Sequence, residues 1–554
     1  MSETDPRLIE NPVRLSESKF WEIQRNYWKN MGILAWKEEV PSYISSNAFI
    51  GHQYASLVLE YIKDIQSNHP HLQDETFYIA ELGAGTGKFS FFFLKAFKEL
   101  CKINKIEKLK FCYIITDIVE KNLEFCQKND CFAGYIENHE LDFAMFNVED
   151  GQDLELRLKG KTYSELQAKA PLIIIANYTF DCIKQDAFEI KEGKLQEEKT
   201  GLRSRYKNFD IKNAKHLNDL RFTYQYYDVD WDQYYSNPHL NEILQEYATR
   251  LQDKDATIMI PLGAIQFLDH LNTLTHGNYF MIVGDKGISQ LERIPILEKK
   301  YRMTYDGCYS FFVNFHSMGE YIKKIGGDSL LSENDNSFKV CLFSQGASFN
   351  QLKNTYAYFS SYIENVGPDE YCYIYDEYIT NSFRYHLKAI MSFLRLSRWD
   401  TNAYSVIHDR LIELLPTADK SMLLEIDRDL AKVQDNVYHI NIGDDIYNFL
   451  GNVYQTQGQD EKAIELYQES ITCFPDRSAP HHNLGLIYDK ERNTTKALYH
   501  YQKAYEFDKK NRFANKRVAQ LSGKPNWLVF IPLLKLLVVL GVMGLVLLLF
   551  GRWN

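Results

Sequence analysis

The sequence predicts an α/β domain, then an all-α helical solenoid, then one membrane-spanning helix. Apolar strand-like runs alternate with helical stretches over residues 77–190, which is typical of a parallel sheet with helices on both faces. A helical pattern repeats once near the C-terminus, and residues 527–550 are almost wholly apolar. The 554 residues are enough for two or three globular units. We therefore expect the α/β domain over residues 1–340, with 191–235 as a possible insertion or loosely packed β region, and the helical domain over 380–523.

Composition narrows the classes of function. A net charge of −11 argues against general nucleic-acid binding, which depends on neutralising phosphates, so no nucleic-acid partner is expected. The nine cysteines are scattered without a CxxC pair, which favours reduced thiols in a cytosol-facing protein over a disulfide framework. The N-terminal residues are polar and acidic, without the apolar core of a signal peptide.

The first predicted strand, residues 77–82, carries Glu81 near its end and leads into a glycine-rich turn. The turn contains Gly83, Gly85 and Gly87, and a helix follows it. Such a strand–turn–helix unit brings backbone N–H groups close to a nucleotide-like ligand. The pattern therefore marks residues 81–87 as a candidate cofactor site.

The spacing of the glycines decides between ligands. A phosphate-binding P-loop needs a glycine where Leu82 stands and a hydroxyl where Phe89 stands. A dinucleotide turn needs its last glycine where Lys88 stands, and the carboxylate of Glu81 would repel the pyrophosphate. That carboxylate suits a cation, such as the ammonium or sulfonium of S-adenosylmethionine. We therefore expect this cofactor in a Rossmann-like class I methyltransferase domain; the alternative is a glycine turn without a ligand.

The next strands place further candidates at the carboxyl edge of the sheet, where ligands bind. The strand 110–117 ends on Asp117, which would accept hydrogen bonds from ribose hydroxyls; taken alone, it would be interpreted as a helix N-cap. A third strand is expected at 145–148, after which residues 147–150 would meet the adenine ring. Further strands are expected at residues 171–177, 257–260 and 279–283.

The strand predicted at residues 171–177 leads into polar and aromatic residues that would suit the binding of a methyl acceptor. Asp181 is the best general-base candidate, with Asn177 to orient the acceptor. Tyr178 and Phe180 would face the sulfonium through a cation–π contact, unless both lie in the core, which is the commoner position for Phe180. His316 is a weaker base candidate, because a lone histidine is more often structural.

The helical half contains an internal repeat. Gly451 and Gly485 hold equivalent positions 34 residues apart (485 − 451), which is the period of tetratricopeptide repeats. Because stacking needs about three repeats, we expect degenerate repeats over 385–435 and a capping helix over 512–521. Such a segment predicts a protein partner. The two clear repeats cover residues 444–477 and 478–511.

Residues 527–550 approach the ~20 apolar residues that span a bilayer, and Lys535 is their only charge. Trp527 and Trp553 bracket the segment as interfacial anchors do. Basic residues are more frequent before the segment than after it, so the positive-inside rule keeps the main body in the cytoplasm. We expect a single-pass C-terminal membrane anchor; the alternative is a buried C-terminal helix or an in-plane hairpin.

Several blocks of the sequence resemble the MidA-like class I methyltransferases, which include the mitochondrial arginine methyltransferase that assists respiratory complex I assembly. The resemblance covers roughly residues 25–330, and it implies the S-adenosylmethionine cofactor, with Glu81 at its methionine portion and Asp117 at its ribose. The blocks occur in family order at residues 42–51, 81–87, 113–117, 176–183, 284–287 and 309–318.

Departures from the family pattern lie on the acceptor side. Tyr178 replaces the family's glutamate after Asn177, and residues 182–185 replace its A-L-P-V element. The lost carboxylate argues against arginine as the acceptor, since guanidinium recognition favours bidentate carboxylate pairing. Two hypotheses follow: a membrane-tethered methyltransferase whose repeats recruit a protein substrate, or a repeat-based scaffold with a catalytically inactive S-adenosylmethionine-binding domain.

Overall fold

The computed structural model divides into two compact units. The first contains the residues up to Asn381 together with Leu394–Asp400, and the second contains Ser382–Phe393 and the residues from Thr401 onward. The structure describes residues 7–35, 43–206, 208–210, 213–230, 233–297, 302–305, 308–334, 336, 338–440 and 443–522.

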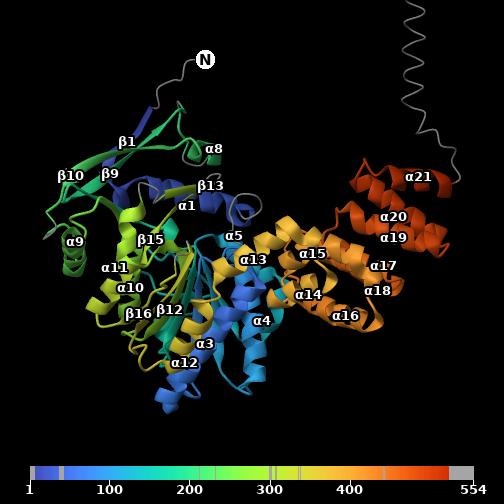
Figure 1. The fold of residues 1–554 in the computed structure, drawn as a ribbon, viewed down its shortest axis with the longest axis horizontal. Helices are drawn as coiled ribbons and strands as arrows, with labels where there is room; N and C mark the ends of the chain where they lie inside the picture. Colours follow the sequence, from blue (N-terminus) through green and yellow to red (C-terminus); the bar gives the residue numbers. More distant parts are fainter. Residues whose placement is uncertain are drawn as a thin grey trace, which may run out of the picture. The chain divides into compact units, whose positions relative to one another are not determined.

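The centre of the first unit is an eight-stranded sheet of strand order β16-β17-β12-β7-β2-β3-β4, with β15 paired to β12 (Figure 1). β17 runs antiparallel to both of its neighbours, and the other pairs are parallel. The order reverses between β2 and β7, and ligands of such sheets bind beside the carboxyl ends at that switch point. The strands are β2 (Phe77–Leu82), β3 (Phe111–Asp117), β4 (Leu141–Met145), β7 (Leu172–Asn177), β12 (Tyr279–Ile288), β15 (Val313–Asn314), β16 (Asp328–Leu330) and β17 (Phe338–Gln345).

Helices cover both faces of this sheet, so its central strands are apolar and buried along their length. On one face, Tyr61 of α3 (Ala48–Asn68) stacks on Phe280 of β12. α4 (Lys88–Ile103) lies on the same face, and its Phe93 packs on Tyr113 of β3.

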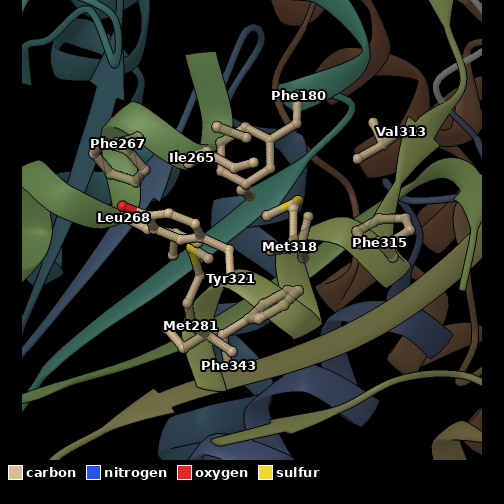
Figure 2. Packing of buried hydrophobic residues seen from close by; sticks show 14 of the residues in the cluster. Phe180, Ile265, Phe267, Leu268, Met281, Val313, Phe315, Met318, Tyr321 and Phe343 are labelled. Atoms are coloured by element: carbon tan, nitrogen blue, oxygen red, sulfur yellow. The ribbon is translucent and has the colours of Figure 1, made fainter. Parts of the chain in front are cut away.

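The opposite face carries the largest apolar cluster of the unit. Figure 2 shows Met281 of β12, the neighbour of Phe280, among side chains such as Leu268 and Met318. Successive residues of a strand point to opposite faces, so β12 contributes to both layers. The helices on this face are α9 (Pro238–Arg250), α10 (Leu262–Leu274) and α11 (Phe315–Lys324).

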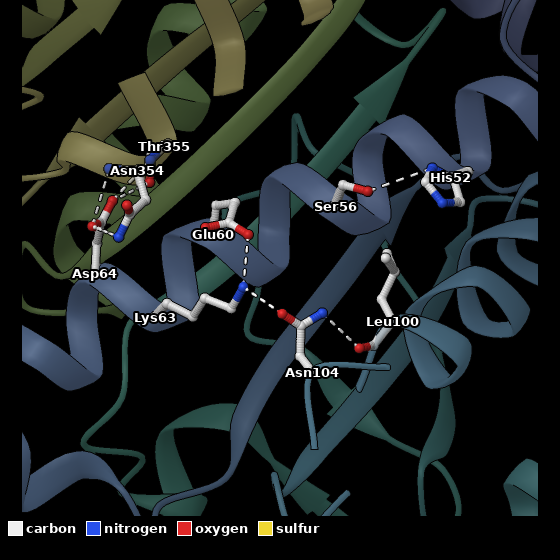
Figure 3. A network of polar contacts seen from close by, with 9 residues as sticks. All are labelled: His52, Ser56, Glu60, Lys63, Asp64, Leu100, Asn104, Asn354 and Thr355. Carbon is white, nitrogen blue, oxygen red and sulfur yellow. Dashed lines mark hydrogen bonds and ion pairs between the residues drawn. The ribbon is translucent and has the colours of Figure 1, made fainter. Parts of the chain in front are cut away.

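A polar network fixes α3 against the last helices of the unit. The carboxylate of Asp64 accepts hydrogen bonds from the backbone N–H groups of Asn354 and Thr355, at the start of α12 (Lys353–Tyr358), and from both of their side chains (Figure 3). It therefore satisfies helix N-terminal N–H groups that have no partner within α12. The residue before Asp64, the more exposed Lys63, donates hydrogen bonds to Glu60 and Asn104.

A second, antiparallel sheet lies apart from the first in the same unit. β9 pairs with β8, β1 and β10, and β8 pairs with β11. The region predicted as a possible insertion, residues 191–235, supplies all of β9 and all of β10. The described N-terminal residues begin with β1, and α1 (Phe20–Met31) follows it. The strands are β1 (Arg7–Arg14), β8 (Asp186–Lys191), β9 (Lys194–Ser204), β10 (Arg221–Asp228) and β11 (Ala256–Ile260).

The second unit is helical, as the sequence predicts. A Cβ placed on Gly451 would lie 2.5 Å from the ring of Tyr467, and one on Gly485 would lie 2.6 Å from Tyr501. Glycine is therefore required where the two helices of each repeat meet. The helices are α14 (Leu387–Leu396), α15 (Thr401–Leu414), α16 (Lys420–Asp435), α17 (Ile446–Thr456), α18 (Asp460–Cys473), α19 (Ser478–Lys490), α20 (Thr494–Phe507) and α21 (Arg512–Leu521).

The strand expected at 145–148 lies earlier in the chain, as β4, which ends at Met145. Residues 147–150 therefore follow the carboxyl edge of the sheet directly.

Within the described parts of the chain, none of the helices has the length and apolar character to cross a bilayer. The predicted membrane segment, 527–550, lies outside the described residues.

Candidate cofactor site

A cavity lies at the carboxyl ends of β2, β3, β4 and β7, at the switch point of the main sheet. Gly83 lines it after β2, Asp117 after β3, Asn147 after β4 and Tyr178 after β7. Four strands thus bring together residues that are up to 95 positions apart (178 − 83). This is the place where an open α/β sheet binds its ligand.

The glycine turn has the backbone geometry that its sequence implies. Gly83, Gly85 and Gly87 have φ angles of 64°, 57° and 74°, a left-handed conformation that strains residues with a Cβ. The N–H of Gly85 donates to Oδ2 of Asp117 at 2.9 Å. The turn therefore approaches the cavity as bare backbone and is tied to the neighbouring strand.

Asp117 is buried beneath the turn and accepts several hydrogen bonds. In addition to Gly85, the N–H of Val119 donates to its Oδ1 at 2.8 Å, and Nδ2 of Asn122 donates to its Oδ2 at 3.2 Å. Burial raises the pKa of Asp117 to about 6, although these donors oppose the shift. A carboxylate offers about four acceptor positions, so this one can still accept from a ligand hydroxyl.

Glu81 lies behind the turn and does not line the cavity. Its Oε2 accepts hydrogen bonds from Tyr113, at 2.8 Å, and from Ser90 of α4. Burial raises its pKa to about 7, and the negative charge of Asp117 adds to the shift. The structure thus gives Glu81 partners that tie β2 to β3 and α4, where the sequence suggests direct contact with the cofactor.

The segment after β7 places one aromatic residue at the cavity. Tyr178 has a φ of 49°, which is uncommon for a residue with a side chain, and its N–H donates to the carbonyl of Gly284 at 2.9 Å. Tyr178 lines the cavity and its ring packs on that of Phe338, whereas Phe180 is fully buried in the core. Of the two aromatic candidates, Tyr178 is therefore the one that can face a ligand.

Asn177 lies beside this segment but does not line the cavity. Its Oδ1 accepts a hydrogen bond from the hydroxyl of Tyr54 at 3.0 Å, and its buried Nδ2 has no partner in the described structure. A Cβ on Gly284 would lie 2.4 Å from that Oδ1, so the close approach of β12 requires glycine there.

Asp181 and Asp285 form a buried carboxyl pair behind the same segment. Asp285 Oδ2 accepts the N–H groups of Thr179 and Phe180 at 3.2 and 2.9 Å, and Asp181 Oδ2 accepts Ser310 Oγ at 2.6 Å. Burial raises the pKa of both aspartates, and the negative charge of Asp181 raises that of Asp285 further, so the pair favours one shared proton. Neither lines the cavity, so Asp181 holds the loop rather than facing a ligand.

His316 lies away from the other candidates, in the first turn of α11. Its Nδ1 is 2.9 Å from the hydroxyl of Tyr247 on α9, and burial lowers its pKa. It is not among the residues that line the cavity, and its contacts are those of a packed structural histidine.

Sequence reasoning missed three contributors. Arg25 and Trp28 of α1 line the cavity from outside the strand–helix pattern, and Arg25 Nη1 lies 2.8 Å from Glu149 Oε2. Asp285 of β12 holds the segment that contains Tyr178 by accepting hydrogen bonds from the N–H groups of Thr179 and Phe180. Asp285 follows the predicted strand 279–283 by two residues and lies within the observed β12, and that position was a usable signal. Nothing in the residues of α1 marks that helix as part of a site.

Comparisons with known proteins found two family models and several similar chains. Residues 57–285 match a family model described as "Putative S-adenosyl-L-methionine-dependent methyltransferase", and residues 444–510 match the tetratricopeptide repeat model. A Burkholderia thailandensis protein solved with bound S-adenosyl-homocysteine is 13% identical, with a TM-score of 0.40, and the alignment covers 60% of this chain and 88% of that one.

Curated relatives match shorter stretches. The chain is 35% identical over 74 residues to the uncharacterized protein ycf37 of Cyanophora paradoxa, covering 13% of this chain and 43% of that protein. It is 28% identical over 119 residues to the photosystem I assembly protein Ycf3 of Synechococcus sp. (strain CC9311), covering 22% and 66%. The chain thus spans less than two thirds of the length of these relatives.

The fold, the site and the match over residues 57–285 support an S-adenosylmethionine-dependent methyltransferase domain in the first unit, with S-adenosylmethionine as its cofactor. Residues 444–510 of the second unit match tetratricopeptide repeats. The chain therefore joins a methyltransferase-like domain to a tetratricopeptide segment.

Proposed function

We propose that this chain is a methyltransferase of the MidA-like type that acts on a protein held by its tetratricopeptide segment. The observation that carries the proposal is the cavity at the switch point, where the glycine turn, Asp117 and Tyr178 meet. We further propose that residues 527–550 tether the chain to a membrane as a single-pass anchor, with the main body in the cytoplasm. Their nearly uncharged composition supports this part.

The residues of the cavity fit the cofactor. We assign Asp117 to the ribose, because it retains acceptor capacity beside three protein donors. Gly83, Gly85 and Gly87 allow the backbone to approach the ligand closely, and Glu81 supports the turn from behind. Bound there, S-adenosylmethionine supplies a methyl group on a positively charged sulfur.

The protein's part in the reaction is to orient the reactants and exclude water. Tyr178 is held at the cavity by a hydrogen bond from its own N–H to the carbonyl of Gly284 and by hydrogen bonds from the next two N–H groups to Asp285. An aromatic face in that position favours a neighbouring cation. Since direct methyl displacement needs no covalent intermediate, most of the rate enhancement comes from such positioning and from desolvation.

The acceptor side argues for a substrate that does not need a strong base. Among the described residues, the charged side chains lining the cavity are Arg25, Asp117 and Glu149, and Glu149 is paired with Arg25. Asn177 stays a candidate to orient the acceptor through its unpartnered Nδ2. The same lack of a base favours the second candidate function, a repeat-based scaffold whose domain binds the cofactor without turnover.

Calorimetry with S-adenosylhomocysteine tests the cofactor site. The wild-type chain should bind, and Gly85→Asp should not, because the added carboxylate would enter the turn beside Asp117. Absence of binding by the wild type would refute both candidate functions.

Transfer of labelled methyl groups from S-adenosylmethionine into lysate proteins separates the two candidates. Label in a protein band supports the enzyme, and binding without label supports the scaffold. Asn483→Arg changes the second repeat, where Asn483 bonds to Asn448 and Asn452. It should reduce labelling without changing affinity for S-adenosylhomocysteine. Recovery of the full-length chain in the soluble fraction after cell lysis would contradict the membrane anchor.

A further inference from the structure

One face of α1 lies over the cavity. Arg25, Trp28 and Gly32 follow one another at helical spacing, so they share a face. Arg25 and Trp28 line the cavity, although α1 belongs to none of the strand–helix units that build its floor.

Contacts at both ends of that face locate Trp28 between them. At one end, Arg25 Nη1 is 2.8 Å from Glu149, in the segment after β4. At the other end, a Cβ on Gly32 would lie 3.2 Å from Asn122 Oδ1 and 3.9 Å from Val119, in the segment after β3. Trp28 therefore lies over the gap between the segments that follow β3 and β4.

The adenosine part of the cofactor belongs in the same gap. In nucleotide-binding α/β folds, the carboxylate at the end of the second strand binds the ribose, and here that residue is Asp117. The base would then extend toward the next strand, where Phe146 and Val148 offer apolar surface to the cavity. A partly exposed indole above this surface would complete two sides of a slot for a flat ring.

We propose that Trp28 stacks on the adenine ring and that α1 is the roof of the adenosine site. This inference rests on the proposed cofactor site and adds a binding residue to it. The Arg25–Glu149 ion pair fixes the roof at one end, and the packing of Gly32 on Asn122, which itself holds Asp117, fixes it at the other.

Tryptophan fluorescence with fragments of the cofactor tests the stacking. S-adenosylhomocysteine and 5′-deoxy-5′-methylthioadenosine, which both carry adenine, should quench the wild-type emission, whereas methionine should not. Trp28→Phe keeps an aromatic face, so it should bind within about threefold of the wild type but lose the quenching. Trp28→Ala should weaken binding of both adenine ligands by about tenfold, the effect typical of losing one stacked base.

Trp21→Phe is the matched control. Trp21 also lies on α1, but it is 1% exposed and its Nε1 donates to the carbonyl of Leu15 at 2.7 Å. This variant should keep both the quenching and the affinity. Equal quenching in Trp28→Phe and wild type, or unchanged affinity in Trp28→Ala while calorimetry shows binding, would overturn the stacking and leave the cofactor site standing. No heat from the wild type would overturn both.

Discussion

The buried carboxylate of Glu81 should make the first unit less stable as the pH rises. Its pKa is about 7 in the folded chain against the ordinary value of 4.5, because burial disfavours the charged form. The folded state therefore holds this proton more tightly than the unfolded state does. The stabilisation is fully present below about pH 4.5 and is lost as the pH rises through 7.

The size of the effect follows from the two pKa values. Linkage between 4.5 and about 7 gives a loss of about 2.5 kcal/mol between pH 5 and pH 8. Glu81→Gln isolates it, since the amide keeps an oxygen for Tyr113 and Ser90 but does not titrate. Histidines such as His52, whose pKa burial lowers to about 4, act in the opposite direction, but they are common to both chains and cancel in the difference.

Urea unfolding of wild type and Glu81→Gln at pH 5, 6, 7 and 8, followed by tryptophan emission, measures that difference. The variant should gain on the wild type by about 2.5 kcal/mol from pH 5 to pH 8. A difference in the free energy of unfolding that stays constant with pH, or that shifts in favour of the wild type as the pH rises, would refute the reasoning. Glu81 would then be ionised in the folded chain at low pH, with a counter-charge that the contacts above do not include.

Three further predictions concern packing, capping and the ligand. Asp64→Ala removes the acceptor of four hydrogen bonds and should lower the free energy of urea unfolding by about 3 kcal/mol. The control Glu60→Ala loses only a partly exposed ion pair and should lower it by less than about 0.5 kcal/mol. Similar losses in the two variants would contradict the capping role of Asp64. Gly451→Ala puts a Cβ 2.5 Å from the Tyr467 ring and should destabilise the helical unit by about 1–3 kcal/mol, measured by far-ultraviolet circular dichroism melts. The control Gly134→Ala, whose Cβ would meet nothing within 4 Å, should leave the stability nearly unchanged. Affinity for the cationic S-adenosylmethionine should rise from pH 5.5 to 8, because Glu81 and Asp117 lose their protons over that range. Calorimetry in buffers of different ionisation enthalpy should show that binding releases protons. An affinity that does not change with pH would contradict this prediction.

The sequence alone was enough for the strand–turn–helix unit at residues 77–103. Buried parallel strands are continuous apolar runs, and a left-handed turn needs glycine, so both features are local and visible in the residues. The 34-residue repeat was equally visible, because each repeat packs mainly on its neighbours. The observed β2 and α21 agree closely with the predicted ranges, and α4 follows the turn as expected.

The acceptor side could not be predicted in this way. Asp181 is a plausible base in sequence, but its orientation depends on Ser310 and Asp285, which are more than 100 residues away and join it only through the sheet. In the sequence, Tyr178 is noticeable only as a departure from the family pattern. In the structure, its φ of 49° and the hydrogen bond from its N–H to Gly284 of β12 place it at the cavity.

The α/β domain with its cofactor and the helical repeats could be read from the residues, because these features depend on periodicity and on glycine at fixed spacing. Which side chains share the cavity depends on how distant elements pack. That packing turned Glu81 toward Tyr113 and Ser90, left His316 against Tyr247, and brought α1 to the cavity. A side chain's direction is set by the elements packed around it, and those contacts lie far away along the chain.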